Sequence, residues 1–182
     1  MSGDHWWWDM PEFVAAQRDP GFRAWVQSIE LGMDLGEEPF DEIIPGLPIR
    51  DPFSDEGIIA AETAFLHTFA DRRALDADFP LMMRFVRYLG QAYVEKLECR
   101  WVAQPNIKPW SLSSPAIEFP WPGTNMLLDL IPVMNGTVSP PRRGDDWIYV
   151  FRNNRKDHQK WVEQGRPGFA EWKAHDQEIG AT

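Results

Sequence analysis

The chain of 182 residues contains very little cysteine and little histidine. Its single cysteine, Cys99, excludes an internal disulfide and a zinc site built from cysteines. The four histidines (His5, His67, His158 and His175) lack metal-ligand spacing, and a metal site needs several convergent donors. No serine lies in a nucleophile-elbow pattern, and no glycine run resembles a phosphate-binding loop. We therefore expect no metal, no cofactor and no catalytic residue.

The sequence also lacks a long apolar run. No segment is long enough to cross a bilayer, and no basic region precedes an apolar run near residue 1. We therefore expect no membrane association and no signal peptide, and with one cysteine the reducing cytoplasm is the expected location. The length and the 43% of apolar residues favour a single domain over residues 1–182. Residues 1–10 are expected to form a loose tail, or to dock through their tryptophans on the domain or on a partner.

Basic residues are scarce in the first part of the chain. Residues 1–78 carry 17 acidic and 5 basic residues, a balance of −12, whereas residues 79–182 carry 11 acidic and 13 basic residues, a balance of +2. The stretch from residue 34 to residue 56, called here the acidic segment, contains Arg50 as its one base. Its acids are Asp34, Glu37, Glu38, Asp41, Glu42, Asp51, Asp55 and Glu56. Such a surface repels nucleic acid and attracts a basic protein, although a merely solvated acidic surface is the simplest alternative.

The clearest periodic pattern predicts a helix that begins at residue 79. Polar residues recur along it at steps of three or four: Arg84, Arg87, Gln91, Glu95 and Glu98. This spacing is typical of a helix with a broad apolar face, which belongs in a core. Asp78 is expected to cap the amino end of this helix, and Pro80 suits its first turn. Gly90 weakens a helix, so its presence predicts the close approach of a neighbouring element.

The remaining patterns predict an α+β fold, with amino-terminal helices packed on a carboxy-terminal antiparallel sheet and one or two closing helices. The expected helices before residue 79 are 11–17, 20–33 and 54–73, with a long loop at 35–53. The expected strands are 99–103, 116–121 and 146–152, and the expected closing helices are 156–164 and 169–178. The apolar run at 126–134 is long enough for a buried strand or a short helix, and Pro132 excludes an uninterrupted version of either.

Several polar residues are candidates for chemistry or for structural contacts. Glu118 and Asp129 lie in apolar segments, where they either share acid–base work or each point out of the sheet. Cys99 has both acids and bases nearby and is interpreted as a buried structural cysteine. A basic set either pairs with the acidic half of the chain or binds an anionic ligand. Its members are Arg142, Arg143, Arg152, Arg155, Lys156 and Lys160.

One stretch carries a family resemblance. Residues 85–90 read Phe-Val-Arg-Tyr-Leu-Gly, and Leu97 and residues 100–102, Arg-Trp-Val, follow. This resembles uncharacterised bacterial domains in which a helix with a Leu-Gly step runs into a strand that begins with tryptophan. Some proteins of this kind are small acidic immunity proteins made beside polymorphic toxins. The resemblance covers about 25 of the 182 residues, implies a helix-then-sheet fold and transfers no catalytic residue.

The main functional hypothesis is a cytoplasmic protein-binding module, most concretely an immunity protein that blocks the active site of a toxin. The residues expected to bind the basic partner are Asp34, Glu37, Glu38, Phe40, Asp41, Glu42, Trp6, Trp7 and Trp8. One alternative is a small enzyme or ligand-binding domain. Its pocket would be lined by Trp101, Trp121, Trp147, Tyr149 and Glu118. A second alternative is an assembly protein without separate activity, and we expect a monomer or a small homo-oligomer.

Overall fold

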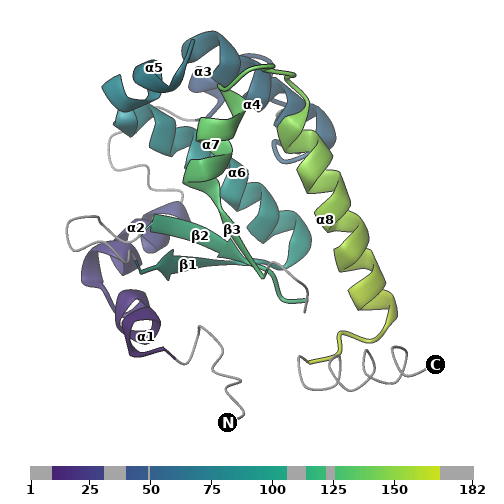
Figure 1. The fold of residues 1–182 in the computed structure, drawn as a ribbon. Helices are drawn as coiled ribbons and strands as arrows, with labels where there is room; N and C mark the ends of the chain where they lie inside the picture. The colour runs from purple at the N-terminus through teal and green to yellow at the C-terminus, as the bar shows by residue number, and fades with distance from the viewer. Residues whose placement is uncertain (1–9, 31–39, 49, 106–113, 122–125, 169–182) are drawn as a thin grey trace.

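The structure, a computed structural model, describes residues 10–30, 40–48, 50–105, 114–121 and 126–168. Its helices are α1 (Pro11–Gln17), α2 (Pro20–Glu30), α3 (Phe40–Ile43), α4 (Asp55–Thr68), α5 (Arg72–Ala77), α6 (Phe79–Leu97), α7 (Leu130–Thr137) and α8 (Asp146–Glu163). Its strands are β1 (Arg100–Gln104), β2 (Ser114–Glu118) and β3 (Leu127–Asp129). The strands form an antiparallel sheet of order β1-β2-β3 preceded by helices (Figure 1), so the predicted α+β class is confirmed.

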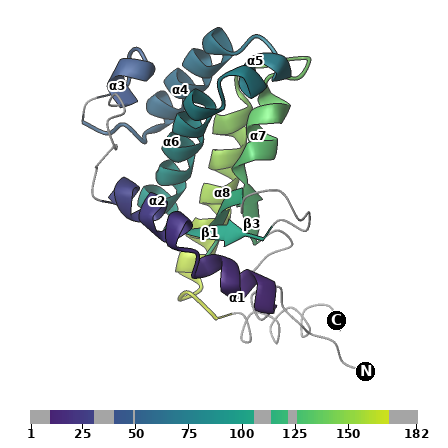
Figure 2. The same ribbon diagram turned by 90° about the vertical axis from the view of Figure 1, so that its left-hand side faces the viewer.

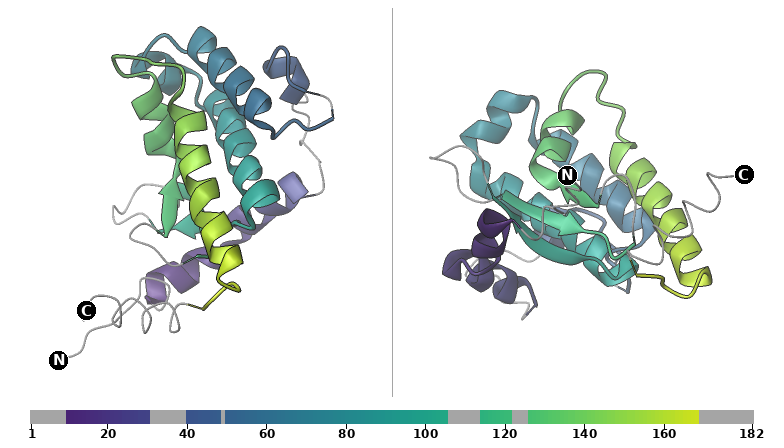
Figure 3. Two further views of the ribbon diagram at one scale, coloured as in Figure 1. Left: turned by 90° about the vertical axis from the view of Figure 1, so that its right-hand side faces the viewer. Right: turned by 60° about the horizontal axis from the view of Figure 1, so that its bottom comes forward.

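Helix α6 is the central element of the fold. It contacts α4, α5, α7, α8, β1 and β2, and α8 lies alongside it (Figure 3). As predicted, the Asp78 carboxylate caps its amino end by accepting the Leu81 N–H at 3.1 Å. Arg84 and Arg87 are buried together with the apolar face of α6. Their spacing in the sequence places them among the polar positions of the helix and does not predict this burial. The Arg87 guanidinium lies 5.2 Å from the ring centroid of Trp25, so a cation–π contact accompanies its burial.

The close approach predicted at Gly90 is confirmed. A Cβ atom placed on Gly90 would lie 2.8 Å from Cζ3 of Trp101 and closer still to two other atoms of that ring. Trp25 packs edge-on against the same ring, with 4.9 Å between the centroids. The glycine therefore provides the space in which the first buried side chain of β1 docks on α6.

The two faces of the sheet are covered differently, because alternate strand residues point to opposite sides. Trp101 and Ile117 face each other across β1 and β2 and belong to the main core with α6. On the opposite face, Phe13 of α1 packs on Val102 and Ala116, and Figure 2 shows α1 on that side of the sheet. The sheet is therefore sandwiched between α1 and the larger helical layer.

Helix α1 also covers one edge of the sheet. The Gln17 side chain accepts the backbone N–H of Ala103 at 2.9 Å and donates to the carbonyl of Ala103 at 2.6 Å. Strand β1 is an edge strand, and edge strands present unpaired backbone groups that can join other chains. Gln17 satisfies two such groups, much as a neighbouring strand would.

The strand predicted at residues 146–152 is wrong, since these residues form the first part of α8. Trp147 and Phe151 are buried at the spacing of one helical turn, whereas Tyr149 is 67% exposed. The alternating aromatic and β-branched side chains therefore do not mark the two faces of a sheet. The helix predicted at 156–164 is the second half of the same helix.

The helix predicted at 54–73 is two helices. Its start is confirmed, because the Ser54 hydroxyl accepts the Gly57 N–H at 3.3 Å. Its end is wrong, because α4 stops at Thr68 and a separate short helix, α5, follows. Asp71 starts α5 by accepting the Ala74 N–H at 3.0 Å, so the arginines expected to end one helix begin another.

The ambiguous run at 126–134 contains both a strand and a helix, β3 and then the start of α7. Asp129 ends the strand and caps the helix, accepting the Ile131 N–H at 3.1 Å. Pro132 lies in the first turn of α7, where the N–H it lacks has no partner within the helix.

Other predictions lie partly or wholly outside the described residues. The expected loop at 35–53 contains one short helix, α3, in its described part. The tail at 1–10 and the closing helix at 169–178 fall almost entirely outside that part. Among the helices that the structure describes, none combines the length and the apolar character needed to cross a membrane.

Candidate functional site

The described part of the acidic segment runs from α3 to the first turn of α4, and Tyr88 of α6 fixes it to the core. Phe40 packs edge-on against the Tyr88 ring at 5.6 Å, and the Tyr88 hydroxyl donates to the Pro52 carbonyl at 2.6 Å. Asp41, next to Phe40, is exposed, and Figure 2 shows α3 projecting beside α4 and α6. The described part of the segment is thus attached to the core, with Asp41 in solvent.

Most of the residues predicted to bind a partner cannot be placed. Asp34, Glu37, Glu38, Trp6, Trp7 and Trp8, and the side chain of Glu42, lie outside the described residues. Phe40 is half-buried by its contact with Tyr88, so it anchors α3 to the domain. Its contact with a partner, like that of the others, stays a prediction.

Two acids of the segment form ion pairs with the second part of the chain. The Asp51 carboxylate lies 2.7 Å from Nζ of Lys96. The Asp55 carboxylate lies 2.9 Å from Nε of Arg152 and 2.8 Å from Nη1 of Arg155. A pocket of about 330 Å³ lies between the start of α4, the end of α6 and the middle of α8, and it is lined by Asp51, Asp55, Lys96 and Arg155 among others. Internal pairing, one of the two roles considered for the basic set, is therefore confirmed for both arginines.

The Asp55 ion pairs predict a pH dependence of stability. Burial opposes ionisation of Asp55, but hydrogen bonds and charge from Arg155 and Arg152 outweigh it and lower the pKa of this carboxyl. A lowered pKa gives stability that is present above the unfolded-state value of about 4 and is lost below it. We expect Asp55→Asn to lower the free energy of unfolding by about 1 kcal/mol near pH 7. That difference should shrink as the pH falls from about 5 to about 3.

Urea unfolding of both proteins across this pH range measures the effect. The matched control is Asp55→Asn in a chain that already carries Arg152→Ala and Arg155→Ala, where the substitution should cost little at any pH. A difference between Asp55 and Asn that persists unchanged at acid pH would contradict the ion-pair account.

Helices α4 and α8 cap each other. Glu62 of α4 is fully buried, and its carboxylate accepts the backbone N–H groups of Asp146 at 2.9 Å and Trp147 at 3.0 Å. In return Arg142, which precedes α8, donates to carbonyls at the end of α4. These belong to Leu66 at 2.6 Å, Phe69 at 2.9 Å and Ala70 at 2.8 Å. Each helix end thus gains partners that its own backbone cannot supply.

The buried carboxylate of Glu62 has a shifted pKa. Burial raises the pKa of Glu62 above its usual range, while the hydrogen bonds from the Trp147 and Asp146 backbones oppose that rise. The amino end of a helix carries partial positive charge, which favours an acid at this position. Glu62 and Arg142 therefore have structural roles, and Arg142 is committed to carbonyls at and just beyond the end of α4.

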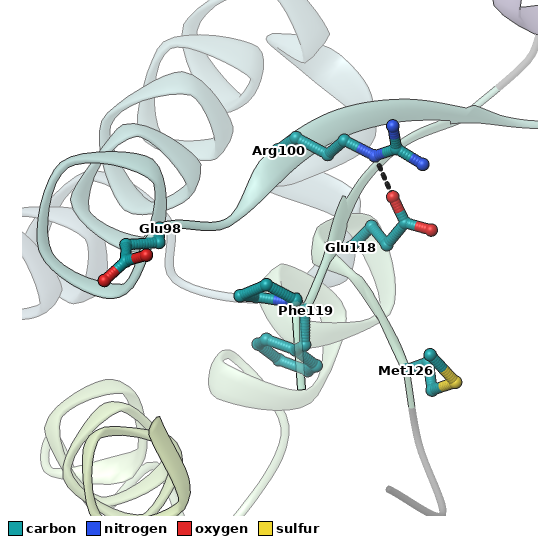
Figure 4. Close-up of a pocket in the computed structure, with 6 residues that line it drawn as sticks. Glu98, Arg100, Glu118, Phe119 and Met126 are labelled. Carbon is teal, nitrogen blue, oxygen red and sulfur yellow. Dashed lines mark hydrogen bonds and ion pairs between the residues drawn. The ribbon is translucent and has the colours of Figure 1, made fainter. Parts of the chain in front are cut away.

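A second hollow, called here the sheet-end pocket, lies where β1 begins and β2 ends (Figure 4). It measures about 490 Å³ and is lined by Glu98, Arg100, Glu118, Phe119, Pro120 and Met126. Arg100 and Glu118 are direct cross-strand neighbours, and Nε of Arg100 donates to the Glu118 carboxylate. The Arg100 side chain is 71% exposed, whereas that of Glu118 is 10% exposed. Glu118 is therefore largely buried and paired with Arg100, on the same face of the sheet as that arginine.

Glu98 joins this pocket to the end of α8. Its φ of +54° is the left-handed conformation that commonly ends a helix, here α6. Its carboxylate accepts a hydrogen bond from the guanidinium of Arg166 at 2.7 Å and lies 3.3 Å from Nε2 of His158. The hydrogen bonding from Arg166 lowers the pKa of Glu98. His158 packs against the rings of Trp121 and Trp161 at 5.6 and 5.9 Å. Its side chain is 13% exposed, so His158 is largely buried between these rings.

The aromatic pocket of the ligand-binding alternative is not formed. Trp101 packs on Gly90, Trp147 is buried in the core and donates to the Thr137 hydroxyl at 2.8 Å, and Tyr149 faces solvent. Of the five side chains expected to line one aromatic pocket, Glu118 is the one that lines the sheet-end pocket.

The other candidate groups have structural partners. Asp129 caps α7 and accepts the Ser114 hydroxyl at 3.3 Å, and burial raises its pKa against these hydrogen bonds. Cys99 is buried, which raises the pKa of its thiol, as the structural interpretation requires. Within the described parts of the chain, no three histidine, cysteine, aspartate or glutamate side chains gather to hold a metal ion.

No protein-family model, curated protein or solved structure matches this chain. The resemblance to immunity proteins therefore rests on residues 79–102 alone and stays a prediction.

Proposed function

We propose that this chain is a cytoplasmic protein-binding module whose acidic segment docks on a basic protein. Its most concrete form is an immunity protein that covers the active site of a toxin. The segment supplies negative charge, which steers a basic partner into contact and favours the correct orientation. Inhibition then needs no chemistry from this chain, because the bound segment excludes the substrate of the partner.

The observation that carries the proposal is the attachment to the core of the described part of the acidic segment, in which two acids stay exposed. Tyr88 holds that part through Phe40 and Pro52, which lowers the entropy cost of ordering it on binding. In the described part of the chain, ion pairs engage Asp51 and Asp55 of this segment and leave Asp41 and Glu56 exposed. These pairs offset part of the balance of −12 over residues 1–78, and two described acids of the segment remain in solvent.

The test is the salt dependence of association with the natural partner, captured from native cells and then purified. We expect the association rate to fall steeply as ionic strength rises, because screening removes long-range attraction. Reversal of charge at Glu37, Glu38, Asp41 and Glu42 to lysine should slow association at low salt by about ten-fold or more. Surface plasmon resonance gives both rates.

The matched control reverses four exposed acids elsewhere to lysine: Glu12, Asp76, Asp157 and Glu163. It changes the net charge by the same amount but leaves the acidic segment intact, so its association rate should fall much less. Equal effects of the two quadruple variants, or association that ignores ionic strength, would sink the proposal.

A further inference from the structure

The sheet-end pocket contains a buried carboxylate with unused capacity to accept hydrogen bonds. An ionised carboxylate has about four acceptor positions. Among the described residues, Arg100 is the one that donates to Glu118, and it does so through Nε alone. In Figure 4 the other oxygen of Glu118 is turned away from Arg100. This oxygen receives no donor from the described residues and is not sealed away from solvent, so a donor that enters the pocket can reach it.

The two charges of the pair are not equivalent inside the pocket. The Arg100 side chain is 71% exposed, so water screens its charge, whereas the Glu118 side chain is 10% exposed. Glu98, at another wall of the pocket, is paired with Arg166, so the negative charge that matters here is that of Glu118. Because water screens the charge of Arg100 more than that of Glu118, the potential beside Glu118 is negative and favours a cationic donor.

The remaining walls favour an apolar body beside that cation. Phe119, Pro120 and Met126 supply aromatic, ring and thioether surface, and none of them carries a charge. The volume of about 490 Å³ falls in the range of pockets that hold small molecules or single side chains. An ammonium or guanidinium group on an aliphatic stem matches both the carboxylate and these walls.

We propose that the sheet-end pocket binds an organic monocation, with its ammonium or guanidinium group on Glu118 and its aliphatic stem against Phe119 and Met126. The ligand is either a basic side chain of another protein or a free small amine, which share this chemistry. None of the described lining residues belongs to the acidic segment, so this site and the proposed docking of a basic protein stand or fall separately.

The probe is n-butylguanidinium, and its neutral isostere n-butylurea is the matched control ligand. A titration followed by the backbone NMR signals of residues 118–121 should saturate with butylguanidinium at a dissociation constant on the order of 1 mM. Butylurea should cause no saturable shift. Saturable binding of butylurea with equal affinity would overturn the proposal, because the charge of the ligand would then be irrelevant.

Two variants shift the affinity in opposite directions. Glu118→Gln preserves the shape of the side chain and removes its charge, so butylguanidinium should bind about ten-fold more weakly or not at all. Arg100→Met removes the competing cation at an exposed position, so binding should tighten about three-fold or more. The control Glu163→Gln, an exposed acid at the end of α8, should bind like the native protein.

Arg100→Met keeps the proposal falsifiable if Glu118→Gln fails to fold, as judged by its thermal unfolding. Weaker or unchanged binding by Arg100→Met, or native affinity in a folded Glu118→Gln variant, would overturn the assignment of Glu118. To separate the two ligand sources, the tripeptide acetyl-Gly-Arg-Gly-amide is compared with butylguanidinium. Binding of both assigns the pocket to a protein side chain, and binding of butylguanidinium alone assigns it to a free small amine.

Discussion

Replacing Glu62 with alanine is expected to lower the free energy of unfolding by about 3 kcal/mol. The carboxylate accepts two backbone N–H groups at the start of α8, and the site is fully buried, so water cannot replace it. Asp145, at the N-cap position of α8, makes no side-chain cap hydrogen bond that would compensate. The variant leaves both N–H groups without an acceptor and opens a cavity beneath the first turn of α8.

Urea unfolding followed by circular dichroism measures this loss of unfolding free energy. Two further variants test whether the loss comes from the capping hydrogen bonds. Glu62→Gln keeps one acceptor oxygen, so it should lose less, about 1 to 2 kcal/mol. Thr63→Ala, at the exposed neighbouring position of α4, is the matched control and should change the free energy of unfolding by about 0.5 kcal/mol or less. If Glu62→Ala is no less stable than Thr63→Ala, the capping account of α8 is wrong.

Replacing Gly90 with alanine is expected to cost about 3 kcal/mol of stability, even though alanine is the better helix former. The added Cβ overlaps the Trp101 ring, which Trp25 backs at 4.9 Å and Gln91 holds through a 3.3 Å hydrogen bond. Because the ring is fixed on two sides, the clash has to be relieved by moving α6 away from β1. We expect a lower midpoint of thermal unfolding and altered tryptophan fluorescence.

The matched control is Gly136→Ala in α7, where an added Cβ meets no atom within 4 Å. There the gain in helix propensity should leave the stability unchanged or raise it by up to about 1 kcal/mol. Trp101→Phe in the Gly90→Ala background should restore part of the lost stability, because the smaller ring vacates space. Equal stability of Gly90→Ala and Gly136→Ala would show that Trp101 does not constrain the helix.

Local sequence patterns predicted the features whose causes are local. Asp78 and Ser54 begin helices because their side-chain oxygens accept N–H groups three residues later in the chain. Gly90 pointed to a close neighbour because glycine weakens a helix interior and needs a local reason to stand there. The uneven charge, the basis of the proposed function, can be counted directly from the residues.

The errors fall where a distant residue decides the local structure. Residues 146–152 have the composition of a strand, but Glu62, 84 positions before Asp146, supplies the acceptors that start a helix there. The end of α4 is likewise fixed from far along the chain, since Arg142 donates to the carbonyl of Leu66, 76 positions earlier. No window of neighbouring residues contains either partner, so periodicity and propensity alone give the wrong element.

The candidate sites likewise combine features that the sequence sets with features that contacts between distant segments set. The sequence by itself determined that the chain is acidic over residues 1–78 and that its longest helix is a core helix. Only the tertiary structure decided which acids remain available, because ion pairs engage Asp55 while Asp41 stays exposed. It also decided that Glu118 is buried opposite Arg100, since strand register sets which residues face each other. Burial and register are properties of contacts between segments, and those contacts form only when the whole chain folds.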